Sequence, residues 1–165
     1  MQETDDFAKT ILKHQALLFK VSRIYVDNTE DQKDLFQEIV FQLYKSFQNF
    51  KGNSKVTTWM YRVAMNTAIA FLNKSKRQVT TITDFDFPEI IDEKDHAAQE
   101  QTDLMYQYIK KLNVIEKGII LLYLEGKNHE EISEITGFTK TNVGTRIGRI
   151  KQKLKETIRK KESWK

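Results

Sequence analysis

The 165-residue chain contains no cysteine, and its single proline is Pro88. Without cysteine there can be no disulfides, thiolate zinc sites or cysteine nucleophiles, and nothing indicates an oxidising compartment. No apolar run approaches the roughly 18 residues of a membrane span. The acidic first ten residues do not resemble a secretion signal. We therefore expect a cytoplasmic protein without membrane insertion.

Motifs that carry catalysis are scarce as well. The three histidines are His14 in an apolar stripe, His96 in an acidic segment and His129 at the expected start of a helix. None has a carboxylate or nucleophile at a recognisable spacing, and no glycine-rich loop that could cradle a phosphate is present. The sequence therefore predicts no enzymatic activity, no metal site and no cofactor.

Charge is distributed in three blocks. Residues 1–77 carry 12 basic and 8 acidic side chains, residues 78–103 carry 1 and 8, and residues 104–165 carry 14 and 7. Two basic lobes thus flank an acidic segment. Basic lobes suit a polyanion such as nucleic acid, whose bound counterions are released on contact. Charge alone leaves an ordinary solvated surface as the alternative.

Apolar residues follow helical spacing in both basic lobes and lose this spacing in the segment between them. Thr29 with Gln32 is typical of a capping box, and Ser54 of an N-cap. From Gln78 to Glu100 the spacing is lost, Pro88 appears and acidic residues accumulate, as in a linker. No strand pattern of useful length occurs. We predict an all-α fold with two small helical domains, residues 1–77 and 101–165, joined by an acidic flexible linker, residues 78–100.

The strongest local pattern runs from Asn128 to Leu154. A short helix capped by Asn128 with Glu131 is followed by a tight turn at Gly137 and an amphipathic helix, which together read as a helix-turn-helix. From residue 138 onward there are 10 basic and 2 acidic side chains. The second helix of such a pair can enter the DNA major groove. Two packed helices with a solvated basic face remain the alternative.

Residues 112–155, LNVIEKGIILLYLEGKNHEEISEITGFTKTNVGTRIGRIKQKLK, resemble the C-terminal promoter-binding domain of extracytoplasmic-function (ECF) sigma factors of bacteria. Residues 31–72 resemble the other domain of that family. The motifs DLFQE, TTWMYRVAMN and EEISEITG, in this order, are more specific together than any one alone. The resemblance implies a transcription initiation factor that binds core RNA polymerase and recognises the minus-ten and minus-thirty-five promoter elements. Such a factor stabilises promoter melting without catalysis of its own.

The resemblance also implies functional residues. Asp34, Gln37 and Glu38 would dock on the clamp coiled coil of the polymerase, and their i, i+3, i+4 spacing puts them on one helix face. The residues implied at the minus-ten element and the adjoining duplex are Phe50, Lys51, Asn53, Lys55, Trp59, Arg62, Asn66, Lys74, Lys76 and Arg77. Those implied at the minus-thirty-five element are Lys140, Thr141, Asn142, Thr145, Arg146, Arg149 and Lys153.

The chemistry of these residues suits their implied roles. An amide-rich loop can hydrogen-bond a flipped base, while aromatic rings and basic side chains can hold single-stranded DNA. Trp59 taken alone is more often a core residue than a stacking platform. Gly144 and Gly148 depart from the bulkier residues usual in the recognition helix, which suggests close approach to DNA or a loosened helix.

The implied partners are core RNA polymerase, through its clamp coiled coil and flap, promoter DNA and an anti-sigma factor. Two other functions fit the residues. One is a polymerase-independent repressor in which residues 1–77 dimerise or sense a ligand, and the other is an all-helical adaptor for proteins. The free chain is expected either to be extended and controlled by a partner or to be compact and self-inhibiting, with Phe87 and Ile90 bridging the domains.

Overall fold

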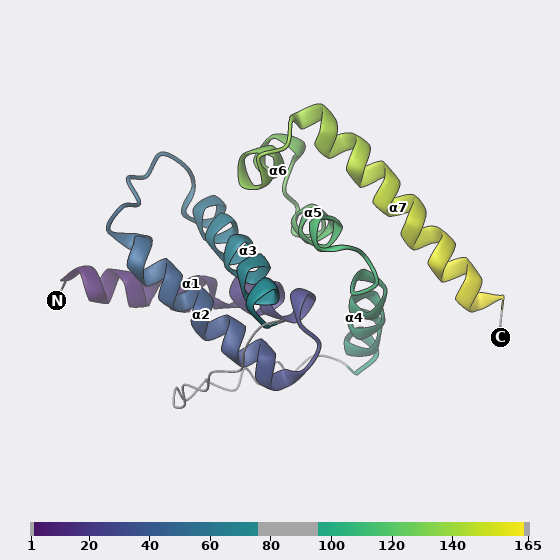
Figure 1. The fold of residues 1–165 in the computed structure, drawn as a ribbon, viewed down its shortest axis with the longest axis horizontal. Coiled ribbons are helices and arrows are strands. Elements are labelled where there is room, and N and C mark those ends of the chain that lie inside the picture. Colours follow the sequence, from purple (N-terminus) through teal and green to yellow (C-terminus); the bar gives the residue numbers. More distant parts are fainter. Residues whose placement is uncertain (1, 76–95, 164–165) are drawn as a thin grey trace.

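The structure, a computed structural model, describes residues 2–75 and 96–163, which form seven α-helices and contain no strand (Figure 1). The predicted all-α fold is confirmed. Lys76, Arg77, Phe87, Ile90 and residues 78–95 of the expected linker lie outside the described residues. The helices are α1 (Gln2–Tyr25), α2 (Thr29–Phe47), α3 (Val56–Ser75), α4 (His96–Ile109), α5 (Val114–Leu124), α6 (His129–Thr136) and α7 (Lys140–Glu162).

Helices α1, α2 and α3 pack together as the first helical unit. Its centre is formed by fully buried Leu18, Leu35, Ile39 and Met60. The helix α1 is interrupted at His14, which has non-helical φ and ψ of −114° and 15°.

The start of α2 differs from the sequence prediction. The N-cap is Asn28, whose side chain accepts a hydrogen bond of 2.7 Å from the backbone N–H of Asp31. The capping box of Thr29 with Gln32 is therefore wrong, and Gln32 instead donates to the carbonyl of Val26 at 3.0 Å. Because asparagine is a better N-cap than threonine, the helix begins one residue earlier than that box requires.

Helices α4 to α7 form the second helical unit, around buried Ile119, Leu122, Ile132 and Ile150. The helix α4 begins at His96, inside the range expected to be linker. The caps predicted at Asn113 and Asn128 are both present. Gly137 has a φ of +83°, a left-handed conformation that favours glycine, so the chain turns sharply between α6 and α7.

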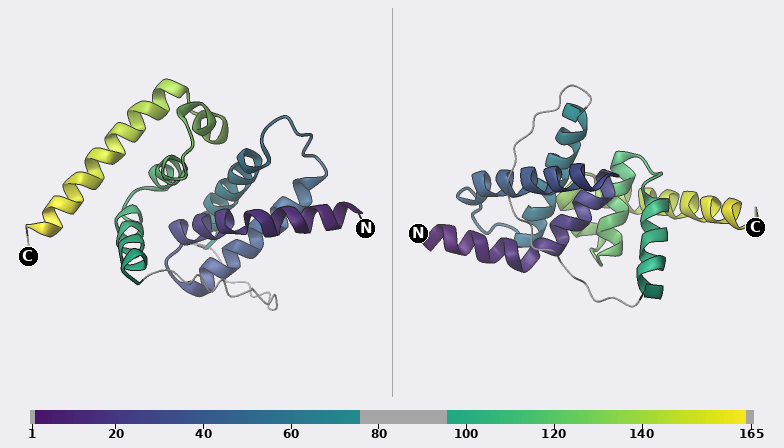
Figure 2. Two further views of the ribbon diagram at one scale, coloured as in Figure 1. Left: turned by 180° about the vertical axis from the view of Figure 1, so that it is seen from behind. Right: turned by 90° about the horizontal axis from the view of Figure 1, so that it is seen from below.

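The two helical units are in direct contact. Helix α3 packs against α6, and α1 packs against α5. Buried residues of both units belong to one continuous hydrophobic cluster, which includes Tyr25 and Met65 of the first unit and Ile119 and Ile132 of the second. Figure 2 shows the two units side by side from two further directions, with the N-terminus and the C-terminus at opposite ends. The chain is therefore compact in this conformation.

Candidate nucleic-acid and partner interfaces

The helix α7 is fixed on the second unit by Val143, Ile147 and Ile150, all buried. Its opposite side carries the polar residues singled out in the sequence. Arg146 is half-buried among them, and the exposed ones are Lys140, Thr141, Asn142, Thr145, Arg149 and Lys153. Several of these line an open hollow of about 360 Å³ on this side. The helix thus presents amides, hydroxyls and guanidinium groups outward, as a helix that reads a DNA groove does.

Two contacts hold Arg146 in place. Its Nε donates to Oδ1 of Asn142 at 2.6 Å, and its guanidinium carbon lies 4.3 Å from the centroid of the Phe138 ring. An arginine has five N–H donors in a rigid fork, so the remaining ones stay available. The side chain is therefore pre-oriented before any DNA binds.

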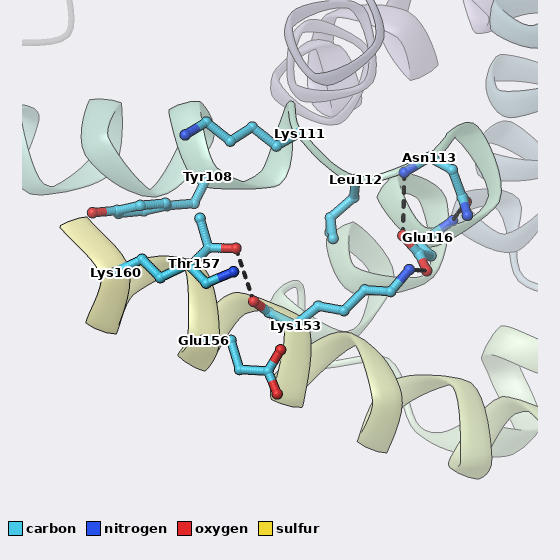
Figure 3. A pocket seen from close by; sticks show the side chains of 9 residues that line it. All are labelled: Tyr108, Lys111, Leu112, Asn113, Glu116, Lys153, Glu156, Thr157 and Lys160. Atoms are coloured by element: carbon cyan, nitrogen blue, oxygen red, sulfur yellow. Dashed lines mark hydrogen bonds and ion pairs between the residues drawn. The ribbon is translucent and has the colours of Figure 1, made fainter.

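Lys153 lies on α7, far along the helix from its start at Lys140. It pairs with Glu116 of α5, whose carboxylate also accepts a 3.2 Å hydrogen bond from the backbone N–H of Asn113. Figure 3 shows these contacts in an open groove of about 340 Å³, which α4, α5 and α7 line together. Eleven residues separate Lys153 from Asn142, about 16 Å along the helix axis. In the free protein, Glu116 therefore partly neutralises the charge of Lys153.

The two glycines of α7 do not loosen it, because the helix is continuous from Lys140 to Glu162. A Cβ atom at Gly144 would lie 3.4 Å from Cε1 of His129, so the missing side chain makes room for that imidazole ring. A Cβ at Gly148 would meet nothing within 4 Å. At Gly144 the close approach is thus to another part of the protein.

In the first unit, Trp59 is a core residue. Only 9% of it is exposed, and its ring stacks on the half-buried Phe50 with centroids 4.9 Å apart. Lys51 and Asn53 are exposed in the loop before α3, where Gly52 has a φ of +73°. Asn66 and Lys74 are exposed on α3 itself.

Lys55 and Arg62 face the second unit. An Nη of Arg62 donates to the backbone carbonyl of Glu134 at 2.7 Å, and the ammonium of Lys55 lies 3.9 Å from the carboxylate of Glu131. Two of the basic side chains singled out for single-stranded DNA are thus engaged by helix α6.

Asp34, Gln37 and Glu38 lie on one side of α2. Asp34 is exposed, and the other two are half-buried. Partial burial raises the pKa of Asp34 above its ordinary value, as do the nearby carboxylates of Asp31 and Glu30. This face is therefore acidic and would gain from a cationic partner.

Two family models match the chain. The model described as Sigma-70 region 2 matches residues 10–78, and the model described as Sigma-70, region 4 matches residues 102–154. The chain belongs to the sigma-70 family. It is a sigma factor of the ECF type, a transcription initiation factor that binds core RNA polymerase and directs it to promoters. Recognition of minus-ten and minus-thirty-five elements is the general role of such factors.

Known proteins similar to this sigma factor cover most of its length. RNA polymerase sigma factor SigV of Bacillus subtilis is 28% identical, with 92% of this chain and 90% of SigV aligned. The ECF RNA polymerase sigma-E factor of Escherichia coli is 25% identical, with 92% of this chain and 86% of that protein aligned.

Solved structures share the fold of this sigma factor. CnrH, in complex with the cytosolic domain of CnrY, has a TM-score of 0.68 at 17% identity and covers 94% of this chain and 88% of its own. The sigma factor RpoE of Bartonella quintana, in complex with the anti-sigma factor NepR, has a TM-score of 0.71 at 17% identity. That match covers 93% of this chain and 97% of RpoE. In the described ranges, no helix of the present factor is long and apolar enough to cross a membrane.

The sequence reasoning missed the residues that join the two units of the sigma factor. Tyr25 of α1 is buried against Gly118 of α5, and ion pairs join Lys20 of α1 to Glu125 and Arg23 of α1 to Asp103 of α4. One signal was available. A glycine within an apolar helical run costs stability and usually has a packing reason, and Gly118 stands in such a run.

Proposed function

We propose that the sigma factor docks on polymerase through the α2 face of Asp34, Gln37 and Glu38. The three side chains share one side of the helix, where partial burial and then the nearby carboxylates of Asp31 and Glu30 raise the pKa of Asp34. A basic surface of the clamp coiled coil would supply that partner. The assignment of these residues comes from the family resemblance, and their common face supports it.

The minus-ten strand is assigned to the loop before α3 and to α3. Lys51 and Asn53 are exposed there and can contact a flipped base and its phosphates. Binding must favour the unpaired strand over the duplex by enough to offset a few kcal/mol of unstacking. Trp59 acts here as a support for Phe50, and Lys74 approaches the upstream duplex.

The minus-thirty-five element is assigned to α7, with Asn142, Thr145, Arg146 and Arg149 at the bases and flanking phosphates. Helix α7 gives the strongest support for the proposed function, because it presents a polar, basic face outward from a helix-turn-helix. The pre-oriented guanidinium of Arg146 suits bidentate contact with a guanine edge.

The domain limits stay part of the proposal. Residues 1–77 would carry polymerase and minus-ten binding, and residues 101–165 would carry duplex binding. Because α4 begins at His96, a fragment used to test duplex binding should start there rather than at residue 101.

The factor is proposed to act in the cytoplasm without catalysis of its own and under control of an anti-sigma factor. The similarity in fold to two sigma factors, one solved with the anti-sigma factor NepR and one with the cytosolic domain of CnrY, supports such a partner. Its binding would have to cover the α2 face or α7, because these surfaces contact polymerase and promoter.

A reconstituted transcription assay tests the proposal. Purified core polymerase should start transcripts at defined promoters only when the factor is added, and start sites would identify its promoter elements. The free chain should bind promoter duplex weakly, whereas the complex with core polymerase should bind it tightly. Tight, specific duplex binding by the free chain with no effect on transcription starts would instead favour the repressor.

A further inference from the structure

We infer that Phe138 and Asn142 are positioning residues, which set the base preference of α7 by holding the guanidinium of Arg146 toward a guanine. This inference rests on the proposed function, which gives the outward side of α7 to the minus-thirty-five element. It adds that Phe138 controls the selection of a base without contacting DNA, and that Asn142 does not read an adenine.

The ring of Phe138 is a fixed support at the turn between α6 and α7. The carbonyl of this residue accepts a 2.5 Å hydrogen bond from the Ser133 hydroxyl, and its N–H donates to the Thr136 hydroxyl at 3.4 Å. The half-buried ring also packs against the hydrophobic core. The guanidinium carbon of Arg146 lies 4.3 Å from the ring centroid. At this distance the negative face of an aromatic ring attracts a cation, which an aliphatic side chain cannot do.

Stacking on Phe138 covers one face of the guanidinium and leaves its edge free. The N–H donors of arginine lie in the plane of the group, so a ring against the face takes none of them. The hydrogen bond from Nε to Asn142 takes one donor. The N–H groups of the two Nη atoms therefore remain, and two of them, one on each Nη, are parallel. They match N7 and O6 of a guanine, which are both acceptors.

The same hydrogen bond restricts what Asn142 can recognise. Because Nε of arginine only donates, the amide atom of Asn142 that faces it at 2.6 Å must be the oxygen. An asparagine that reads adenine needs this oxygen to accept from the N6 amino group while its nitrogen donates to N7. Here the oxygen already accepts from a cation, which makes a stronger hydrogen bond than a neutral amino group. Asn142 is left with the two donors of its amide nitrogen, which suit a phosphate or another acceptor.

Arg149 shows what the same side chain does without such support. It lies one helical turn after Arg146 and lines the same open hollow of about 360 Å³. Its side chain is exposed and makes no hydrogen bond or ion pair with the described residues. A long side chain that is free before binding loses rotamer freedom on contact, whereas Arg146 is already ordered. We therefore expect Arg146 to select a base and Arg149 to contribute charge.

Promoter fragments that lack a single acceptor test the inference in the complex of the full factor with core polymerase. Each guanine of a mapped minus-thirty-five element, on either strand, is replaced in turn by 7-deazaguanine, which has no N7 acceptor. Competition binding then measures the loss of affinity. One replacement should weaken binding by the native factor about tenfold. This loss should disappear in Arg146→Ala, which identifies the guanine that Arg146 contacts.

Two pairs of variants separate positioning from packing. Phe138→Leu and Asn142→Ala should reduce the loss at this guanine to less than about threefold, because the guanidinium is no longer held. Phe138→Tyr keeps the aromatic face and Asn142→Asp keeps the acceptor, so both should retain a loss of about tenfold. The matched control is Arg149→Ala, which should weaken binding to the native and the modified promoter equally. A residue that only packs the turn would change stability without changing this discrimination.

Three outcomes would overturn the inference. The first is a minus-thirty-five element without any guanine whose loss depends on Arg146. The second is a loss that stays the same in Phe138→Leu or Asn142→Ala, or that falls equally in the conservative variants. The third is a loss with 7-deazaadenine that vanishes in both Asn142 variants, because Asn142 would then read an adenine. If Phe138→Leu does not fold, the two variants of the exposed Asn142 decide the question.

Failure of the proposed function would give a different result. If only the positioning is wrong, the native factor still starts transcripts, Arg149→Ala still weakens promoter binding, and Arg146→Ala still removes the loss at one guanine. If α7 does not bind the promoter, neither arginine variant changes the affinity of the complex for any of the fragments.

Discussion

Replacing Gly118 with alanine tests the contact between the two units with a single methyl group. The new Cβ would lie 2.7 Å from the Tyr25 hydroxyl oxygen, closer than carbon and oxygen atoms normally approach, and 3.6 Å from the Met65 sulfur. The Tyr25 ring is buried and its hydroxyl also lies 3.4 Å from the carbonyl oxygen of Val114. The tyrosine therefore has little room to move away while the units stay together.

Two opposing terms set the size of the effect. Within helix α5, alanine in place of glycine stabilises by about 0.5–1 kcal/mol. Overpacking a closely packed contact costs about 1–3 kcal/mol. We expect a net loss of about 0.5–2 kcal/mol in the free energy of unfolding, or roughly 2–6 °C in Tm for a chain of this size. The loss cannot exceed the free energy of the contact between the two helical units, because a larger clash would make the units separate.

Urea unfolding of the full chain followed by circular dichroism measures this loss. Tyr25→Phe removes the atom that the methyl group meets, so the double variant Tyr25→Phe with Gly118→Ala should recover most of the stability. The matched control is Gly148→Ala, whose Cβ would meet nothing within 4 Å and which should only stabilise. A Gly118→Ala variant as stable as the Gly148→Ala variant would refute the packing of Tyr25 against α5.

Four further predictions concern other parts of the molecule. Asp34→Arg with Glu38→Arg should abolish retention of the factor on immobilised core polymerase while leaving helicity intact, because reversing charge at an interface costs several kcal/mol. Asp34→Asn should raise stability at pH 7, since the raised pKa of Asp34 means that its ionised form disfavours folding. This gain should vanish as the pH falls below 3.8, where Asp34 is protonated in both states. Arg149→Ala should lower the log–log salt slope of DNA binding by about one, and Lys153→Ala by less, because Glu116 already neutralises Lys153. Asn128→Ala should cost about 1 kcal/mol of unfolding free energy by removing the N-cap of α6, and an unchanged urea midpoint would count against that cap.

The contacts between the two units can be followed in the described residues, whereas Phe87 and Ile90 lie outside them. The sequence suggested that apolar residues of the acidic segment, such as Phe87 and Ile90, would bridge the units of a compact form. In the described residues, the bridge consists of Tyr25, Gly118 and the α3 contacts with α6. Arg62 and Lys55, which are proposed to contact the minus-ten strand, thus contact α6 in the free chain.

Local pattern by itself determined the all-α fold, the caps at Asn113 and Asn128, the left-handed turn at Gly137 and the outward face of α7. Each depends on residues within a few positions of one another, since helical periodicity and capping act over one or two turns. The start of α2 was missed by one residue because both Asn28 and Thr29 can cap a helix, and only the observed backbone distinguishes them.

Tertiary structure alone decided what the buried and basic side chains contact. Trp59 belongs to the core because Phe50 and Phe47 meet it there. Arg62 meets Glu134, 72 positions away, and Lys20 meets Glu125, 105 positions away. An amphipathic pattern specifies which side of a helix is buried but carries no information about which distant helix covers it. For this reason the sequence indicated two helical domains, whereas their direct contact emerged only from the packing of α1 and α3 on α5 and α6.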